Sequence, residues 1–463
     1  MATPLLLLSP TTQAAVFDGA QLGLAWAVPF VGMLLSIALC PLFMSAFWHH
    51  HFGKVAAFWA LAFLLPFTLR FGMDEALSQA SHTLLLEYVP FIIVLWALYT
   101  ISGGICVRGN LHGTPRRNTA MLALGTLLAS IMGTTGAAML MIRPVIRAND
   151  NRRHNAHVII FFIFLVANAG GALTPLGDPP LFLGFLKGVD FFWTTWHLLA
   201  PTALLCGLLL ALFYVLDSYF FHRGQEEYPP LMDPTPDSAL RIDGKRNFLL
   251  LGGVVGAVLM SGLWRPGVHF QVLGLEVELQ NVIRDGLLIV LGLASLLLTP
   301  KSVRVANDFN WGPILEVAKL FVGIFLTIIP VIAMLRAGPA GALSGVVALV
   351  TDGDGRPIDA MYFWLTGGLS SFLDNAPTYL VFFNLAGGDA QTLMTTLSPT
   401  LMAIATGAVF MGAVTYIGNA PNFMVKAIAE ERGIEMPSFF GYMAWSVALL
   451  IPCFLLLTWV FFP

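Results

Sequence analysis

The chain has 463 residues, of which 57% are hydrophobic and only 11% are charged, with a mean hydropathy of +0.80 and a formal net charge of −3. Because soluble proteins carry about 25% charged residues, most of this surface must face hydrocarbon. The sequence therefore predicts an all-α polytopic membrane protein. These figures exclude soluble enzymes, and the small net charge gives no basis for binding nucleic acid.

The predicted spans fall into two halves. A helix that crosses the hydrocarbon core needs about 20 mostly apolar residues. After an N-terminal tail at 1–22, the first half (23–221) contains five such segments, near 23–46, 55–70, 85–105, 155–187 and 192–221. A charged, proline-rich linker at 222–245 follows. The second half (246–463) contains five more segments, near 246–263, 284–300, 312–335, 392–430 and 437–462.

Two further apolar stretches, at 119–147 and 360–388, are each interrupted in the middle. The interruptions are Gly133-Thr134-Thr135-Gly136 and Asp374-Asn375-Ala376-Pro377. A straight helix through either interruption would leave backbone groups unpaired in lipid, which is costly. We therefore expect each stretch to form a re-entrant hairpin, in which two short helices meet within the membrane and return to the same side.

The basic residues support a topology in which the hairpins do not cross the membrane. When the loops alternate between two faces, one face collects 16 of the 23 Lys and Arg residues and the other collects 6. Basic residues concentrate on the cytoplasmic side. The linker at 222–245 is therefore predicted to be cytoplasmic and the C-terminus outside, in a bacterial inner membrane. With five crossings in each half, the second half enters the membrane with the opposite orientation.

The two halves also match in sequence at a fixed offset of 241 positions. The segment 171–182 aligns without gaps with 412–423, with six of the twelve positions identical, and the same offset superposes the two hairpin interruptions. Inverted repeats with interrupted helices at the midplane are typical of secondary transporters. We therefore expect an inverted repeat in which 155–187 and 392–430 are broken helices.

The interruptions define a candidate site for ions and substrate, because helix breaks free backbone groups that ligate them. We predict two clusters, each pairing a hairpin tip with a broken-helix loop. The first comprises Thr134, Thr135, Thr174, Gly177 and Asp178, and the second comprises Asp374, Asn375, Thr378, Thr415, Gly418 and Asn419. The alternative is simple kinking, since Gly and Pro are common in membrane helices. Polar interruptions at four repeat-related places favour binding.

Asp178 and Asp374 are the charged residues that fall at the predicted breaks. A charge at the bilayer centre costs about 2.5–3.5 kcal/mol on insertion scales, so it needs a reason. A carboxylate supplies hard oxygen ligands for a small cation, and a desolvated carboxylate can instead hold a proton. We therefore expect sodium ligands at Asp178, Asp374, Asn375 and Asn419. The alternative for either aspartate is that it only caps a half-helix N-terminus.

Other polar features lead to further expectations. Glu316 and Lys319 lie three residues apart and are expected to form an ion pair on one helix face, with a proton-relay role for Glu87 or Glu316 as the alternative. Asp217 is expected at the membrane interface. The sequence has no nucleotide-binding, haem, zinc or nucleophile motif. We therefore expect no cofactor and no enzymatic activity, and transport energy drawn from an ion gradient.

At these motifs the sequence resembles the ion transporter superfamily, which includes the NhaD-type sodium/proton antiporters and the citrate (CitMHS-like) transporters. The resemblance covers 23–462 and is most specific at 167–178 (ANAGGALTPLGD) and 370–377 (SSFLDNAP). It implies a homodimer in which each protomer has a scaffold and a mobile transport domain that moves as an elevator. It also implies sodium sites between each hairpin tip and its broken-helix loop.

Two functions stay open. The first is Na⁺/H⁺ antiport, in which Asp178 and Asp374 alternate between Na⁺ or Li⁺ and H⁺. The second is sodium-coupled symport of citrate or a dicarboxylate anion. Divalent-anion symporters of the superfamily carry Ser-Asn-Thr at both hairpin tips, whereas this chain has Gly133-Thr134-Thr135 and Asp374-Asn375-Ala376. An added aspartate repels such an anion, so the sequence favours cation/proton exchange. A passive channel suits paired, repeat-related hairpins less well.

Overall fold

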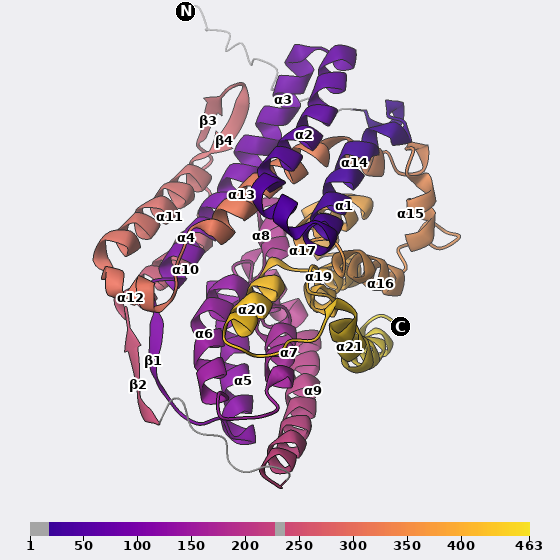
Figure 1. The fold of residues 1–463 in the computed structure, drawn as a ribbon. Helices are drawn as coiled ribbons and strands as arrows, with labels where there is room; N and C mark the ends of the chain where they lie inside the picture. Colours follow the sequence, from indigo (N-terminus) through magenta and orange to yellow (C-terminus); the bar gives the residue numbers. More distant parts are fainter. Residues whose placement is uncertain (1–17, 227–236) are drawn as a thin grey trace, which may run out of the picture.

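Helices make up almost the whole fold of the computed structural model, which describes residues 18–226 and 237–463 (Figure 1). Residues 1–17 of the predicted tail and 227–236 of the predicted linker lie outside the described residues. Within the described ranges, eight helices are long and apolar enough to cross a membrane, or nine if one bent pair forms a single span. The prediction of an all-α multi-pass membrane protein is confirmed.

The first half begins with three apolar spans. A π-helical turn at Leu84–Tyr88 joins α3 to α4, so that the two form one continuous span over Met73–Ser102. The helices in chain order are α1 (Val28–Phe43), α2 (Ser45–Phe71), α3 (Met73–Thr83), α4 (Val89–Ser102), α5 (Pro115–Met132), α6 (Thr134–Ala148), α7 (Ala156–Leu165), α8 (Pro179–Leu186) and α9 (Phe191–Glu226).

The second half contains a corresponding series. Its helices are α10 (Arg246–Leu263), α11 (Leu279–Leu298), α12 (Lys301–Ala306), α13 (Gly312–Thr327), α14 (Ile329–Arg336), α15 (Ser344–Val350), α16 (Asp359–Ser370), α17 (Asn375–Leu385), α18 (Ala390–Met394), α19 (Ser398–Met411), α20 (Ala420–Glu431) and α21 (Phe439–Phe461). The pair α13–α14 bends by 41°. Pro330 lies in the first turn of α14 and has no N–H to continue the α13 ladder, which accounts for the bend.

Both predicted hairpins are interrupted where the sequence indicates. Gly133 separates α5 from α6 at φ +80°, in the left-handed region that glycine adopts without strain. In the second hairpin α16 ends at Ser370, and Asp374 occupies the N-cap of α17. Helix α5 packs against α6, and α16 packs against α17.

The two predicted broken helices are also interrupted. Helix α7 is followed by a 3-10 turn at Ala169–Leu173 before α8, and α19 by a 3-10 turn at Gly412–Val414 before α20. The window at Ala156–Leu173 is 89% buried inside the protein, against 22% for α2. Irregular backbone at membrane depth is tolerated where protein surrounds it. Figure 1 accordingly shows α8, α17 and α19 in the middle of the molecule.

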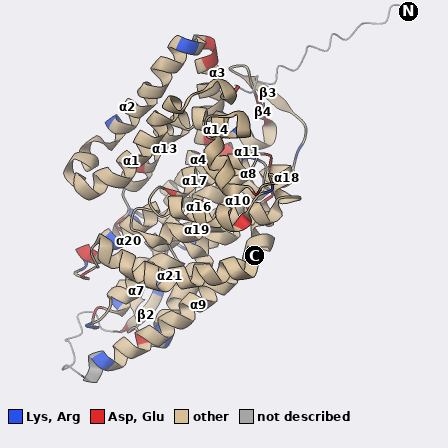
Figure 2. Ribbon diagram, turned by 90° about the vertical axis from the view of Figure 1, so that its right-hand side faces the viewer, with Lys and Arg blue, Asp and Glu red and all other residues tan. Residues whose placement is uncertain are grey.

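The described part of the chain also contains four short strands outside the apolar helices. Strand β1 (Cys106–Asn110) pairs antiparallel with β2 (Ser238–Asp243), which ties the segment after α4 to the end of the predicted linker. Strands β3 (His269–Val272) and β4 (Leu275–Glu278) form a hairpin between α10 and α11. Figure 2 shows that charged residues gather at helix ends and loops, while the body of α21 carries none.

Candidate functional site

Asp178 lies at the break between α7 and α8, in the centre of the molecule. It occupies the N-cap position of α8 with an extended backbone, but its side chain makes no capping hydrogen bond to that helix. The residue is only 1% exposed. The carboxylate is therefore directed away from its own helix, and the alternative of a simple helix cap does not describe Asp178.

Three side chains from three other helix N-termini converge on the Asp178 carboxylate. Thr134, the first residue of α6, donates to Oδ1 from its Oγ1 at 3.0 Å. Asn375, the first residue of α17, donates to Oδ2 from its Nδ2. Asn419, at the N-cap position of α20, donates to Oδ1 from its Nδ2 at 3.5 Å. The partial positive charge of each helix N-terminus favours an anion at this point.

This arrangement differs from the two separate clusters expected from the sequence. Asp178 and Thr134 belong to the first predicted cluster, whereas Asn375 and Asn419 belong to the second. All four are at most 2% exposed. The structure therefore joins the polar residues of both halves around one carboxylate.

Asp374 has a different environment. It is half-buried, and its Oδ1 accepts the Ala376 N–H at 3.1 Å, which caps α17. The Thr378 hydroxyl donates to the Asp374 carbonyl at 3.0 Å, one turn further along. Asp374 therefore caps its own helix through Oδ1, and its role as a sodium ligand stays a prediction. Thr135 lies half-buried beside Thr134, at the start of α6.

The remaining predicted residues shape the breaks. The Thr174 hydroxyl donates to the Ser130 carbonyl at 2.5 Å, and the Thr415 hydroxyl donates to the Ser371 carbonyl at 2.5 Å. Each threonine lies 44 residues after its acceptor, so the same contact fastens the hairpin to the broken helix in both halves. A Cβ at Gly177 or Gly418 would overlap backbone oxygen, so these two positions require glycine.

Sequence reasoning did not select two asparagines that join the halves. Asn168 donates from Nδ2 to Asn422 Oδ1 at 2.7 Å, and Asn419 donates from Nδ2 to Asn168 Oδ1 at 3.3 Å. Both asparagines are fully buried. Asn422 also donates to the Gly412 and Thr415 carbonyls, which supplies a hydrogen-bond donor to backbone oxygens in the break between α19 and α20. The sequence does contain a signal for Asn168, because its polar amide side chain follows directly after a long apolar run.

The charge of Asp178 is distinctive because its hydrogen-bond donors are all neutral. Among the residues that the structure describes, no ion pair includes Asp178 or Asp374. By contrast, buried Asp217 pairs with Arg152 and His157. The Asn375 Oδ1 is also buried without a hydrogen-bond partner in the described chain. In the described chain, the site therefore contains a carboxylate without a cationic partner and an amide oxygen without a hydrogen-bond partner.

The expected ion pair between Glu316 and Lys319 is wrong. Lys319 does not pair with Glu316 in the described chain, and its ammonium instead lies 5.4 Å from the centre of the Phe52 ring. Asp217 is completely buried within the protein, where it pairs with Arg152 in the loop before α7 and with His157 of α7, and its place at the membrane interface stays a prediction. Glu87, on the π-helical turn, forms an ion pair with Lys187 at the end of α8.

Residues 19–462, nearly the whole chain, match the family described as "Putative citrate transport". The chain belongs to this family. It is 26% identical over 335 residues to an uncharacterized transporter of Mycobacterium tuberculosis, covering 70% of this chain and 71% of the relative. A 46 kDa membrane protein of Mycobacterium leprae is 25% identical over 398 residues, covering 85% and 83% respectively.

Membership of the citrate transport family confirms the resemblance inferred from the motifs at 167–178 and 370–377. The protein is a multi-pass membrane transporter and not an enzyme. In the described part of the chain, no group of three or more His, Cys, Asp or Glu side chains is arranged to hold a metal ion.

Proposed function

We propose that the protein is a secondary active transporter that exchanges Na⁺ for H⁺ at Asp178. One observation carries this proposal. The Asp178 carboxylate is 1% exposed and accepts hydrogen bonds from Thr134, Asn375 and Asn419, which belong to both halves. Among the described residues it has no cationic partner. An ionised carboxylate in such a place costs several kcal/mol unless a proton or a cation neutralises it.

Competition between those two neutralising ions is the basis of exchange. A proton on Asp178 leaves the surrounding donors with a neutral acceptor, and a sodium ion on the same group requires that the proton has left. The Asp178 carboxylate and the unpartnered Asn375 Oδ1 are hard oxygen ligands of the type that Na⁺ accepts. Because the two ions cannot share the carboxylate, loading one releases the other.

The matched contacts of the two halves support an inverted repeat and an elevator. Helices α6 and α17 begin 241 positions apart, as do α8 and α20. We propose that these elements form the mobile transport domain of a homodimer in the bacterial inner membrane. The linker at 222–245 would then be cytoplasmic and the C-terminus outside, as the distribution of basic residues indicates.

Sodium-coupled transport of citrate or a dicarboxylate is the second candidate. The family description favours it, and helix N-termini that meet at one point can hold a carboxylate substrate without a basic side chain. Against it stand Asp178 and Asp374 at the same breaks, whose charges repel a di- or tricarboxylate. For this reason we place cation exchange first.

Purified protein in proteoliposomes with an imposed pH gradient separates the two functions. We expect Na⁺ or Li⁺ alone, with chloride as the anion, to dissipate the gradient, and K⁺ to leave it unchanged. If Na⁺ alone has no effect and Na⁺ with citrate produces uptake of radiolabelled citrate, the protein is a symporter and the antiport proposal is wrong.

A further inference from the structure

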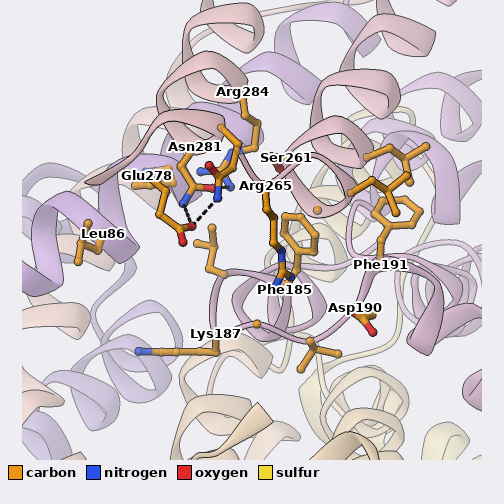
Figure 3. A pocket seen from close by; sticks show the side chains of 18 of the residues that line it. Leu86, Phe185, Lys187, Asp190, Phe191, Ser261, Arg265, Glu278, Asn281 and Arg284 are labelled. Carbon is orange, nitrogen blue, oxygen red and sulfur yellow. Dashed lines mark hydrogen bonds between the residues drawn. The ribbon is translucent and has the colours of Figure 1, made fainter. Parts of the chain in front are cut away.

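A cavity of about 850 Å³ lies between the corner that joins α8 to α9 and the facing ends of α10 and α11 (Figure 3). Its lining includes the start of α9 at Phe191, the end of α10 at Leu263 and residues next to the start of α11, such as Gln280. All three helices are candidate membrane spans. The cavity therefore lies where spans end, at the level of lipid headgroups.

Apolar side chains at the mouth of this cavity face outward. Phe192 is 46% exposed, Trp196 73%, Leu263 75% and Val282 45%. Tryptophan is enriched at the membrane interface because its ring is apolar and its N–H is polar. Since these residues belong to membrane-spanning helices, the mouth of the cavity adjoins the acyl chains of neighbouring lipids.

The inner wall of the cavity provides an anion site. Arg284 is 1% exposed and binds Asp285 through Nε at 2.8 Å and Asn281 through Nη1 at 3.1 Å. Its Nη2 is buried and has no hydrogen-bond partner in the described chain. Arg265 also lines the cavity and extends beside Phe185 in Figure 3. Guanidinium groups in this setting match the geometry of a phosphate.

The remaining charge of the lining is negative. Lys187 and Arg284 are already paired, with Glu87 and Asp285 respectively. Among the described residues, Asp190, Glu276 and Glu278 line the cavity without an ion pair, and Arg265 is the one cationic Lys or Arg side chain without one. A ligand that brings only a phosphate would leave all three carboxylates without a cationic partner, whereas an added ammonium group would pair with one of them.

We propose that this cavity binds the headgroup of a phospholipid that carries both a phosphate and a primary amine, the chemistry of phosphatidylethanolamine. The phosphate binds Arg284 Nη2 and Arg265, the ammonium group donates to Glu278 and its neighbouring carboxylates, and the acyl chains lie along the exposed side chains of α9 and α11. This site is separate from the Asp178 cluster and does not depend on which ion the protein transports.

Native mass spectrometry of the full-length protein with defined lipids tests the proposal. We expect phosphatidylethanolamine to be retained roughly tenfold more strongly than phosphatidylglycerol or phosphatidylcholine, as one charge-assisted hydrogen bond allows. Arg265→Gln should lower phosphatidylethanolamine retention by about the same factor. Glu278→Gln should remove the preference over phosphatidylglycerol. Both side chains are exposed, so neither variant depends on refilling a buried position.

Arg246→Gln is the matched control, because Arg246 is an exposed arginine at the opposite end of α10. Equal retention of the three lipids, preference for either of the other two, or equal effects of Arg246→Gln and Arg265→Gln would overturn the proposal. The last measurement adds free glycerophosphoethanolamine, the headgroup compound without acyl chains, as a competitor of the lipid. If it displaces the lipid at equal concentration, the ligand is a soluble headgroup compound and the lipid assignment is wrong.

Discussion

Replacing Asp178 with asparagine tests the central carboxylate with little change in shape. The amide oxygen still accepts the Thr134 hydroxyl, while the new amide nitrogen faces Asn375 Nδ2, which loses its acceptor. An unpaired buried donor costs about 1–3 kcal/mol. Removal of a buried charge that has no cationic partner offsets this cost, so we expect the variant to fold.

The effect on ion binding is larger. A unit charge about 4 Å from a cation contributes about 4 kcal/mol at an effective dielectric constant of about 20. This energy corresponds to roughly a thousandfold in affinity. Asparagine also cannot carry the exchanged proton. We therefore expect Asp178→Asn to abolish Na⁺-driven dissipation of a pH gradient in proteoliposomes, while the protein elutes as the wild type does on size exclusion.

A paired variant controls for indirect damage. Asp178 and Asn375 share a hydrogen bond across the two halves, so Asp178→Asn combined with Asn375→Asp moves the carboxylate to the other side of the same contact. We expect this double variant to recover part of the exchange that the single variant loses. Wild-type exchange by Asp178→Asn alone would refute the assignment of Asp178 as the exchanging group.

Three further predictions concern other residues. Asp374→Asn should keep the cap of its helix, because Asn and Asp are equivalent N-caps, and should weaken Na⁺-driven exchange in the same assay without abolishing it; complete loss would place Asp374 among the ion ligands. Gly177→Ala forces a Cβ into the Gly171 carbonyl and should cost about 1–3 kcal/mol, measured as a lower thermal midpoint in detergent. Lys187→Ala leaves buried Glu87 unpaired and should cost about 3–5 kcal/mol, and adding Glu87→Gln should restore most of the midpoint.

The fold could be predicted where the sequence changes its chemistry abruptly. Helix α10 begins at Arg246 and ends at Leu263, as expected, because a charged linker precedes it and a polar hairpin follows it. Helix α2 begins at Ser45, ten residues before the predicted span, because His49-His50-His51 lowers the hydropathy of a segment that is still helical. Two of these histidines contact backbone carbonyls one turn earlier, so their polarity is accommodated within the helix.

The site could be predicted only in part, because its polar contacts are between distant segments. The breaks at Gly133 and Asp374 were identified from local residue types, since glycine, proline and short polar side chains have local effects on backbone geometry. The contact between Asp178 and Asn375 could not be identified in this way, because 197 residues separate the two in the sequence. The burial of Asp217 depends likewise on Arg152, which lies 65 residues away. Pairing at such separations is set by tertiary packing.

The shared carboxylate constrains how the protein can move. Asp178 of the first half is held by Asn375 and Asn419 of the second, and Asn168 binds Asn422 across the same boundary. These contacts are buried, and separating them would leave several polar groups unpaired at about 1–3 kcal/mol each.

The ion pairs that connect this centre to the surrounding helices are more exposed to solvent than the asparagine contacts are. Asp308, between α12 and α13, binds Arg143 of α6 at 3.1 Å and Arg432 after α20 at 3.4 Å. In the pair with Arg432, both side chains are more than half exposed, and an exposed pair of this kind contributes about 0–1 kcal/mol. If Asp178 is exposed first to one side of the membrane and then to the other, as we propose, we expect the rearrangement to break contacts of the Asp308 type and to keep the asparagine contacts. On this proposal, both hairpins move together as one unit with the carboxylate inside it.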